Sequence, residues 1–390
     1  MSNHLLQIPY GTKDLLPGEA GLRREMKNRI AEAFVAWGYD QVQTPTFEYL
    51  STFAGGGQVS DSNFKFIDRS NNILMLRTDM TVPLARLVAT RLKGEPGVKR
   101  LFYLSQIFRY EEAQAGRQCE FAQAGIEMMG AAGAAADAEV IALAVEALLK
   151  SGLKNFTISM GHVEFINGLA EAAALNETQV QEVKRCLITR NAVGLEEVID
   201  ANHITGQLAL VFKDLLFLHG GEELLAEMGK KMLSQRCLNT LENLQAIYDL
   251  CRSYGVEKYL TFDLGLIRDF DYYTGMIFEG YTGGLGYPII GGGRYDNMMQ
   301  RFGTSCPATG FAIGIDRIIL ALQRNGETAG HPRCDVYVAY GLGKISEAIK
   351  TAMELRHQGN SVKLAEVEQT RDEAAASADI NGCKGCQYIG

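Results

Sequence analysis

The order of the predicted elements limits the possible folds more than any single motif does. Short segments typical of strands occur before residue 163 and again after residue 254, while residues 163–254 show helical periodicity without strand signals. Strands joined by glycine-rich turns, with runs of helix between them, favour an antiparallel sheet over a doubly wound parallel sheet. We therefore expect an α+β fold with an antiparallel sheet flanked by helices and a helical insertion at about residues 163–254.

Periodicity predicts the individual elements of residues 1–324. A helix is expected at 22–37, where Leu22, Met26, Ile30 and Phe34 recur at intervals of four. The glycines at 291–293 are expected to form a tight turn before a helix, because no Lys-Ser/Thr follows them to complete a phosphate loop. Strands are expected at 41–45, 72–77, 100–110, 120–129, 155–160, 259–264, 273–281 and 308–312, and further helices at 136–153 and 317–324.

The remainder of the chain is expected to form a separate, small α/β unit. Residues 325–332 contain two glycines and a proline and predict a linker between 1–324 and 333–390. Thr370 followed by Glu373 predicts a capping box at the start of a helix. The elements expected here are a strand at 335–340, a helix at 344–358, a strand at 361–366, a helix at 370–380 and a strand that begins near 387.

Composition and charge restrict the class of protein. Hydrophobic residues make up 47% and charged residues 22%, as in ordinary globular proteins. No apolar run reaches the roughly 18 residues that span a bilayer, and the N-terminus lacks the pattern of a signal peptide. We expect a cytoplasmic protein without a membrane partner. The net charge of -8 does not favour a polyanionic partner, although a local basic patch can overcome such a balance.

The eight cysteines are expected to be reduced thiols, as is usual in a cytosolic chain of this length. Only Cys383 and Cys386 have the spacing of a redox or metal motif. No second cysteine pair and no histidine pair accompanies them. We therefore expect no metal site.

Three arginines occur where anions could bind. Arg109 ends an expected strand and offers a planar fork of donors suited to a phosphate or a carboxylate. Arg317 follows a strand that enters a helix through glycines, and a helix start favours anions. Arg268 precedes two consecutive tyrosines. Taken alone, Arg109 is equally explained by a salt bridge and Arg317 by a packed turn.

Two carboxylates, Asp79 and Glu127, complete this set. If Tyr272 and Tyr273 lie in a strand, one hydroxyl lines a pocket while the other packs on the opposite face. Three arginines for a polyphosphate and two carboxylates for a cation suit a nucleotide beside an amino acid. His162 is interpreted as a structural histidine.

Taken together, these motifs resemble those of the class II aminoacyl-tRNA synthetases, and within that class the histidyl-tRNA synthetases. The helix that leads to Gly38 and Pro45 resembles motif 1, which forms the dimer interface in that family. Arg109 with its flanking strands resembles motif 2, and residues 310–317 resemble motif 3. The segments similar to those of the histidyl enzymes are Tyr10–Glu19, Leu266–Tyr273 and Gly292–Asp296.

The resemblance implies a role for each matching residue. Arg109 would contact the α-phosphate of a nucleotide and the carboxylate of an amino acid, Arg317 the distal phosphates, and Arg268 would support amino-acid activation. Where nucleotide binding has been lost, Arg109 and Arg317 would be vestigial. The residues implied to surround a histidine ligand are Asp79, Thr81, Arg109, Gln123, Glu127, Arg268, Tyr272 and Tyr273.

The chain departs from the synthetase pattern in two places. Residues 117–121 read Arg-Gln-Cys-Glu-Phe where synthetases usually read Arg-Tyr-Arg-Gln-Phe, which removes a cation and adds an anion. The segment 333–390 resembles a shortened remnant of an anticodon-binding domain, and it carries seven Lys and Arg against eight Asp and Glu. Because RNA affinity depends on phosphate neutralisation, we expect no tRNA binding.

A shortened member with a retained histidine pocket resembles the regulatory subunits of short-form ATP phosphoribosyltransferases. Their catalytic partner joins ATP to phosphoribosyl pyrophosphate in the first step of histidine biosynthesis, and the synthetase-like subunit supports activity and feedback by histidine. We accordingly expect no catalytic residue and no cofactor. The expected partners are the short-form catalytic subunit, L-histidine as effector, and a second copy of this chain within a larger hetero-oligomer.

Three alternatives remain open at this stage. A histidyl-tRNA synthetase with a shortened anticodon-binding domain would explain the three arginines and would charge tRNA. A ligase that adenylates another small acid would exchange pyrophosphate with other amino acids. A scaffold without a ligand would not bind histidine at all.

Overall fold

The computed structural model describes residues 4–54, 63–110, 118–231, 234–268, 272–326 and 334–390. The chain divides into two compact units. The larger consists of Met1–Lys13 and Met26–Asn325, and the smaller of Asp14–Glu25 and Gly326–Gly390. Most of the linker expected at 325–332 lies outside the described residues.

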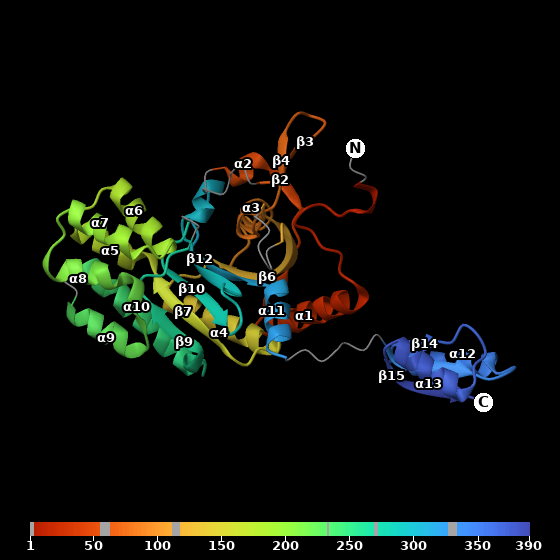
Figure 1. Cartoon of the computed structure of the whole chain (residues 1–390). Coiled ribbons are helices and arrows are strands. Elements are labelled where there is room, and N and C mark those ends of the chain that lie inside the picture. Colours follow the sequence, from red (N-terminus) through yellow and green to blue (C-terminus); the bar gives the residue numbers. More distant parts are fainter. Residues whose placement is uncertain (1–3, 55–62, 111–117, 232–233, 269–271, 327–333) are drawn as a thin grey trace. The chain divides into compact units, whose positions relative to one another are not determined.

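The larger unit is built on a nine-stranded sheet in the order β1-β5-β6-β12-β11-β10-β7-β9-β8 (Figure 1). Within the run from β5 to β7 every pair of adjacent strands is antiparallel, whereas β1 pairs parallel with β5 and β9 pairs parallel with β7. The expected antiparallel architecture is therefore confirmed. The strands are β1 (Asp40–Gln41), β5 (Lys99–Phe108), β6 (Glu120–Met129), β7 (Phe156–His162), β8 (His219–Gly220), β9 (Leu260–Asp263), β10 (Met276–Thr282), β11 (Ile290–Arg294) and β12 (Ala308–Gly314).

One central strand contradicts the expectation from sequence. The glycines at 291–293 do not form a turn before a helix but lie inside β11, between β10 and β12. Glycine-rich strands are rare, because glycine has no side chain to pack and loses much conformational freedom. Here the neighbouring strands leave no room for side chains, and the resulting bare backbone forms part of the site described below.

Helices cover both faces of the sheet. Those packed near it are the part of α1 (Pro17–Ala36) from Met26 onwards, α3 (Thr81–Arg91), α4 (Ala134–Lys150) and α11 (Ile315–Arg324). The helical insertion comprises α5 (Val163–Ala172), α6 (Glu177–Ile188), α7 (Ala192–Ala201), α8 (Gly206–Asp214), α9 (Glu222–Lys231) and α10 (Gln235–Ser253). The two-residue strand β8 interrupts this region, which the sequence had predicted to be free of strands.

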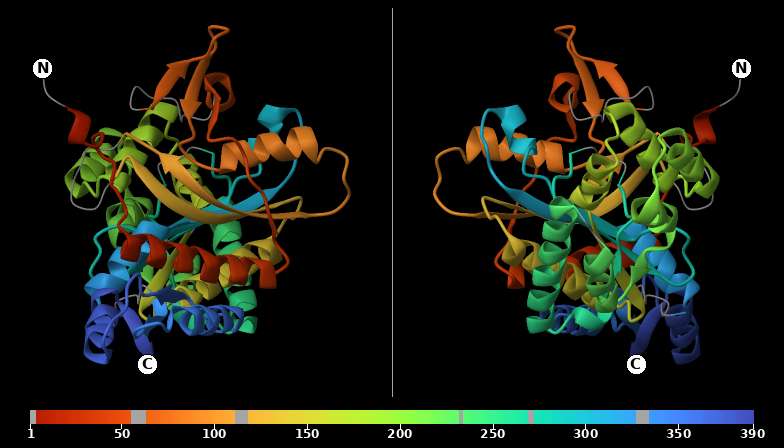
Figure 2. Two further views of the ribbon diagram at one scale, coloured as in Figure 1. Left: turned by 90° about the vertical axis from the view of Figure 1, so that its right-hand side faces the viewer. Right: turned by 90° about the vertical axis from the view of Figure 1, so that its left-hand side faces the viewer.

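Residues of β5 alternate between the two faces of the sheet. Phe102 packs in the core that contains α4 and Met26–Phe34 of α1, whereas Leu101 and Tyr103 pack in the core that contains α3. Figure 2 shows α3 over one face of the sheet and α1 with α4 against the other. This period of two determines which side chains of β5 and β6 can reach a site on the α3 face.

A small antiparallel sheet accompanies α3 in the larger unit. Its strands β2 (Phe47–Tyr49), β3 (Lys65–Ile67) and β4 (Ile73–Leu76) are arranged in the order β2-β4-β3, and α2 (Leu50–Phe53) follows β2. The short 3₁₀ helices are η1 (His4–Leu6), η2 (Leu215–Phe217), η3 (Glu257–Tyr259) and η4 (Met298–Phe302). No helix in the described part of the chain is long and apolar enough to span a bilayer.

The smaller unit has a three-stranded parallel sheet in the order β14-β13-β15. Thr370 and Glu373 form the predicted capping box at the start of α13. The last strand begins at Cys383 and not near residue 387, so it is longer than the sequence pattern predicted. Its elements are β13 (Cys334–Tyr340), α12 (Ile345–His357), β14 (Val362–Leu364), α13 (Arg371–Ile380) and β15 (Cys383–Ile389).

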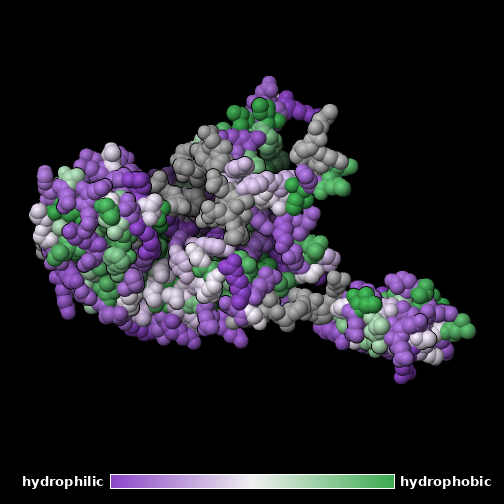
Figure 3. Space-filling view, viewed as in Figure 1, coloured by the Kyte–Doolittle hydropathy of each residue, from purple (hydrophilic) through white to green (hydrophobic). Residues whose placement is uncertain are grey.

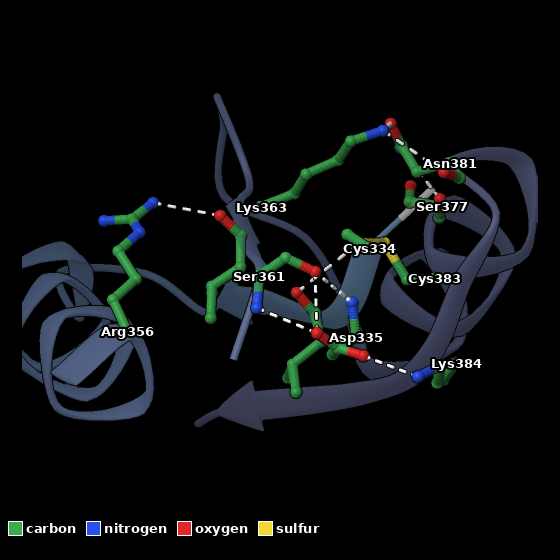
Figure 4. The surroundings of a disulfide bond; sticks show 11 residues. Cys334, Asp335, Arg356, Ser361, Lys363, Ser377, Asn381, Cys383 and Lys384 are labelled. Atoms are coloured by element: carbon green, nitrogen blue, oxygen red, sulfur yellow. Dashed lines mark hydrogen bonds and ion pairs between the residues drawn. A yellow bond between two sulfur atoms is a disulfide. The ribbon is translucent and has the colours of Figure 1, made fainter. Parts of the chain in front are cut away.

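A disulfide joins Cys334 to Cys383 in the smaller unit (Figure 4). The two cysteines face each other across the β13–β15 pair, which brings their sulfurs together. The expectation that all eight cysteines are free thiols is therefore wrong for these two. Next to the bond, Asp335 accepts hydrogen bonds from Ser361 Oγ at 2.8 Å and Lys384 Nζ at 2.7 Å.

Candidate ligand-binding site

A cavity of about 100 Å³ lies on the α3 face of the large sheet. Its walls come from β5, β6, β11, β12, the start of α3 and the segment that precedes β10. The structure brings all the residues singled out from the sequence into this one lining: Asp79, Thr81, Arg109, Gln123, Glu127, Arg268, Tyr272, Tyr273 and Arg317.

Two glycines of the neighbouring strands leave space for this cavity. Gly310 of β12 lies opposite Glu127 of β6, and a Cβ atom on Gly310 would overlap the Glu127 carboxylate. A Cβ on Gly291 of β11 would overlap the Arg268 guanidinium. Strand residues without side chains therefore let charged groups lie directly on the sheet. The glycine-rich sequence of β11 serves this close approach.

Glu127 is fully enclosed, with an exposed fraction of 2%. Its carboxylate accepts a hydrogen bond from Thr81 Oγ1 at 2.8 Å and a short one from the Tyr295 hydroxyl. Burial raises the pKa of Glu127 to about 8, because desolvation outweighs these two donors and the nearby Asp79 charge acts in the same direction. Without a bound cation, this carboxyl is therefore largely protonated at neutral pH.

Asp79 is the second buried acid of the cavity, and it is fixed at the start of α3. The Val82 N–H donates to its Oδ1 at 3.1 Å. A helix start stabilises a carboxylate through its unpaired N–H groups and its dipole. Asp79 and Glu127 therefore concentrate acceptor groups on one side of the cavity.

Arg109 and Arg317 supply positive charge to the lining. Arg109 Nε donates to the Thr78 carbonyl at 2.8 Å, and its guanidinium lies over the Phe121 ring at 5.8 Å from the ring centre. Arg317 Nη1 donates to the Pro288 carbonyl at 2.7 Å, and its guanidinium stacks on Tyr287 at 5.0 Å. These backbone carbonyls and rings help to fix the orientation of both guanidinium groups in the lining.

Arg268, the third arginine of the lining, forms an ion pair with a carboxylate. Its Nη1 donates to Glu279 Oε1 of β10 at 2.9 Å, and both side chains are largely buried. The guanidinium also lies 5.7 Å from the centre of the Tyr273 ring. The ion pair fixes the position of this arginine at the edge of the cavity.

Tyr272 and Tyr273 do not alternate between two faces, because they precede β10 and do not belong to a strand. Their ring centres are 4.7 Å apart and both side chains line the cavity. The expectation that one of them packs on the opposite face is therefore wrong. Burial raises the pKa of both hydroxyls, so they remain neutral hydrogen-bond donors.

Sequence reasoning missed two tyrosines of the lining, Tyr103 and Tyr295. Tyr295 belongs to the segment Gly292–Asp296, which was noted for its resemblance but given no role. The sequence feature that could have indicated its role is the glycine-rich stretch at 291–293 shortly before it. Tyr103 was detectable only from strand alternation, because it lies opposite Gly125 on the same sheet face as Gln123 and Glu127.

The altered sequence at 117–121 is described by the structure only in part. Arg117, most of the preceding loop and residues 269–271 lie outside the described residues. Glu120, the added acid, is not among the described residues of the lining; its Oε1 accepts from Gln106 Nε2 at 3.2 Å. Of the four described residues, 118–121, only Phe121 lines the cavity.

His162 and the paired methionines behave as structural residues. The His162 Nδ1 accepts from the Glu164 N–H at 3.1 Å and so caps α5, and burial lowers its pKa to about 4. Met128, Met129, Met298 and Met299 are buried core residues. Among the described residues, no cluster of His, Cys, Asp and Glu has the arrangement of a metal site.

The arrangement is suited to a small zwitterion. Asp79 and Glu127 present acceptors to an ammonium group, the arginines present donors to a carboxylate, and neutral tyrosines supply rings and hydroxyls. In the described part of this lining, a lysine, cysteine or serine nucleophile is not found. The geometry therefore supports recognition of an amino acid.

Comparison with known proteins places this geometry in context. The family model described as histidyl-tRNA synthetase matches residues 11–318. A relative from Moorella thermoacetica, named ATP phosphoribosyltransferase regulatory subunit, is 43% identical over 391 residues, which cover 100% of this chain and 99% of the relative.

Solved structures agree with these sequence matches. The structure of an ATP phosphoribosyltransferase regulatory subunit/histidyl-tRNA synthetase from Bacillus halodurans C has a TM-score of 0.88 at 32% identity, covering 99% of this chain and 98% of that chain. Histidyl-tRNA synthetase from Nostoc sp. PCC 7120 has a TM-score of 0.84 at 21% identity, covering 97% and 90% of the two chains. The second likeness establishes the class II synthetase fold alone.

Proposed function

Because this chain belongs to the histidyl-tRNA synthetase-like family of ATP phosphoribosyltransferase regulatory subunits, we propose that it binds L-histidine in the cavity beneath α3 and thereby regulates a short-form catalytic subunit. Its role in histidine biosynthesis is regulatory and not catalytic. The alternative of a tRNA-charging enzyme is not favoured by relatives of nearly the same length. The proposed histidine sensor differs from the other two alternatives, because an adenylating ligase would be catalytic and a scaffold would not bind histidine.

One observation carries the histidine proposal: two buried carboxyls, Asp79 and Glu127, converge on one cavity with Gln123 and the tyrosines. Histidine offers an ammonium group and imidazole N–H groups to these acceptors and a carboxylate to Arg109. An ammonium close to Glu127 would favour its ionised form, because an opposite charge offsets desolvation. Binding at neutral pH should therefore release a proton from Glu127.

Regulation requires that histidine bind two conformations of the complex with different affinities. A typical coupling free energy of about 1–3 kcal/mol changes affinity or activity roughly 5- to 150-fold. Arg109 and Arg317 remain in the lining, but in this proposal their phosphate-binding role is vestigial and no cofactor takes part.

We further propose that the building block is a homodimer, to which the catalytic subunit adds. The support is an apolar surface on the small sheet, where hydrophobic side chains gather in Figure 3. Phe47 and Phe66 pack edge to face on one side of this sheet, with exposed fractions of 49% and 41%, while the exposed Ile67 and Ile73 share its other side. Exposed contiguous apolar surface commonly marks an interface.

The regulatory proposal is tested by mixing the chain with a short-form catalytic subunit and measuring phosphoribosyl-ATP formation with and without histidine. We expect Glu127→Ala to abolish inhibition by histidine while the uninhibited rate of the complex stays unchanged. Glu197→Ala, on the exposed surface of α7, is the matched control. Unchanged histidine sensitivity of Glu127→Ala would exclude the cavity as the sensor, and robust charging of tRNA by the chain would exclude the regulatory role.

The homodimer is tested by sedimentation of the isolated chain. A Phe47→Ser, Phe66→Ser double variant should sediment as a monomer at concentrations where the parent is a dimer. Val193→Ser on α7, also at an exposed apolar position, should leave the dimer intact. A double variant that remains dimeric would place the interface elsewhere.

A further inference from the structure

A second cavity, of about 310 Å³, lies beside the first in the larger unit. Its described walls come from the start of α5, one face of α6, and Ile267, Arg268 and Tyr273. Helix α6 turns Gln181, Lys184, Arg185 and Ile188 towards it. These positions follow the i, i+3, i+4, i+7 spacing of one helix face, while Val183, Cys186 and Leu187 of the same helix pack in the core.

All charged side chains in the described lining of this cavity are cationic: Lys184, Arg185 and Arg268. Two of them are ion-paired with acids that are not among the described lining residues, Arg185 with Glu182 and Arg268 with Glu279. Among the described residues, no acid lies within salt-bridge distance of the Lys184 ammonium. In the described part of the lining, which leaves out residues 269–271, the three charged side chains are all cations, and such a lining favours an anionic occupant.

The remainder of the lining is apolar or carries amides. Ile166, Ile188, Ile267 and the Tyr273 ring form apolar walls, which suit a flat, hydrophobic group. The amides of Asn167 and Gln181 also line the cavity, and the Asn167 Nδ2 is already engaged by Glu164 at 2.8 Å. The Asn167 carbonyl oxygen and the Gln181 amide can therefore pair with the polar edge of a heterocycle.

The two cavities share a wall formed by Arg268 and Tyr273. The Arg268 Nε is buried and has no hydrogen-bond partner in the described structure. Such an unpaired donor costs free energy unless a ligand or water satisfies it. An anion in the second cavity would contact the same guanidinium that borders the first.

We propose that the second cavity is a binding site for a nucleoside monophosphate. The phosphate binds Lys184 and Arg185 at the mouth, and the base lies between the isoleucines and Tyr273 with its edge on Asn167 and Gln181. Although the two cavities share Arg268 and Tyr273, the other two arginines of the first cavity, Arg109 after β5 and Arg317 in α11, do not line the second. The proposal is independent of the histidine proposal, because it concerns binding to the isolated chain.

The test is isothermal titration calorimetry of the full chain with the four common nucleoside 5′-monophosphates, and with the parent nucleosides, ribose 5-phosphate and inorganic phosphate. We expect at least one monophosphate to bind more tightly than its nucleoside and than ribose 5-phosphate, since both halves of the ligand are used. Lys184→Glu should weaken that binding at least about tenfold, because it reverses the charge beside the phosphate. Lys230→Glu on the exposed surface of α9 is the matched control and should bind as the parent does.

Two further variants locate the ligand. Ile188→Ser should weaken the monophosphate but not inorganic phosphate, whereas Arg317→Ala, in the first cavity, should change neither. Circular dichroism and the thermal midpoint confirm that each variant is folded. The proposal is overturned if no monophosphate binds at millimolar concentration, if folded Lys184→Glu binds as the parent does, or if Arg317→Ala alone removes binding.

Discussion

The two units of this chain achieve stability by different means. The larger unit has extensive cores on both faces of its sheet, formed by aromatic, aliphatic and methionine side chains. The core of the smaller unit contains nine buried hydrophobic residues, of which six are alanines: Ala339, Ala348, Ala352, Ala365, Ala374 and Ala378. Alanine buries little apolar area, so this unit relies more on its disulfide and on helix capping.

This contrast explains where an unfavourable site can persist. Ionising the buried Glu127 with Asp79 nearby costs free energy, because the carboxylate has lost its hydration and the Asp79 charge repels it. Large cores on both faces of the sheet offset this cost in the larger unit. The small core of the smaller unit provides less stabilisation to offset such a cost. Its charged groups next to the disulfide, Asp335 and Lys384, are at the surface.

The largest expected effect is the loss of the disulfide. Cys334→Ser should destabilise the smaller unit by about 4 kcal/mol, the chain-entropy value for a loop of this length, whose ends are 49 residues apart. Hydrogen exchange of peptides from α13 and β15 should report it. Histidine binding by the larger unit should not change.

Cys386→Ser, at an exposed free thiol of the same strand, is the matched control and should have little effect. Titration of thiols in denaturant without reductant should find six reactive groups in the parent chain, in agreement with the six free cysteines. Eight reactive thiols, or unchanged exchange in Cys334→Ser, would contradict the contrast between the units.

A smaller effect is expected from the buried carboxyl of the larger unit. Because the pKa of Glu127 is raised from 4.5 to about 8, its protonated form stabilises the fold fully below pH 4.5, and this contribution is lost as the pH rises through 8. Glu127→Gln removes the titration and should make the larger unit roughly 1–3 kcal/mol more stable than the parent at pH 8.5. At pH 5 the difference should be much smaller.

Urea unfolding followed by the fluorescence of Trp37 measures this difference, since Trp37 is the only tryptophan of the chain and packs on Tyr254 in the larger unit. Glu197→Gln on exposed α7 is the control and should show the pH dependence of the parent. If Glu127→Gln retains that dependence, another group is responsible for it.

The smallest expected effect concerns the capping box, a helix-start motif that occurs in both units. Asn176 with Gln179 caps α6 in the larger unit, and Thr370 with Glu373 caps α13 in the smaller one. Replacing either cap by alanine should cost about 1 kcal/mol. The melting temperature should fall by about 4–8 °C for Thr370→Ala but by only about 2–4 °C or less for Asn176→Ala, because a smaller unit has a smaller unfolding entropy.

Calorimetry of the two variants measures these shifts, and Thr370→Ser should restore most of the loss because serine also caps a helix. Equal shifts in the two units would indicate that they unfold together as one cooperative body.

Much of the fold followed from periodicity. The strand expected at 120–129 coincides with β6 (Glu120–Met129), and the capping box of α13 is formed by the predicted pair. The strand β11 was missed because Gly291–Gly293 give no side-chain pattern. The Cys334–Cys383 pairing was missed as well, because these residues are far apart in sequence and only the register of β13 with β15 brings them together.

The sequence by itself determined the types and order of the functional groups: the arginines at 109, 268 and 317, the acids at 79 and 127, and the adjacent tyrosines. Tertiary structure alone decided that they surround one cavity, that Tyr103 and Tyr295 join them, and that a cation-lined cavity lies beside it. The physical reason is that side-chain identity is local, whereas burial, and with it the raised pKa of Glu127, depends on strands and helices that are distant in the chain.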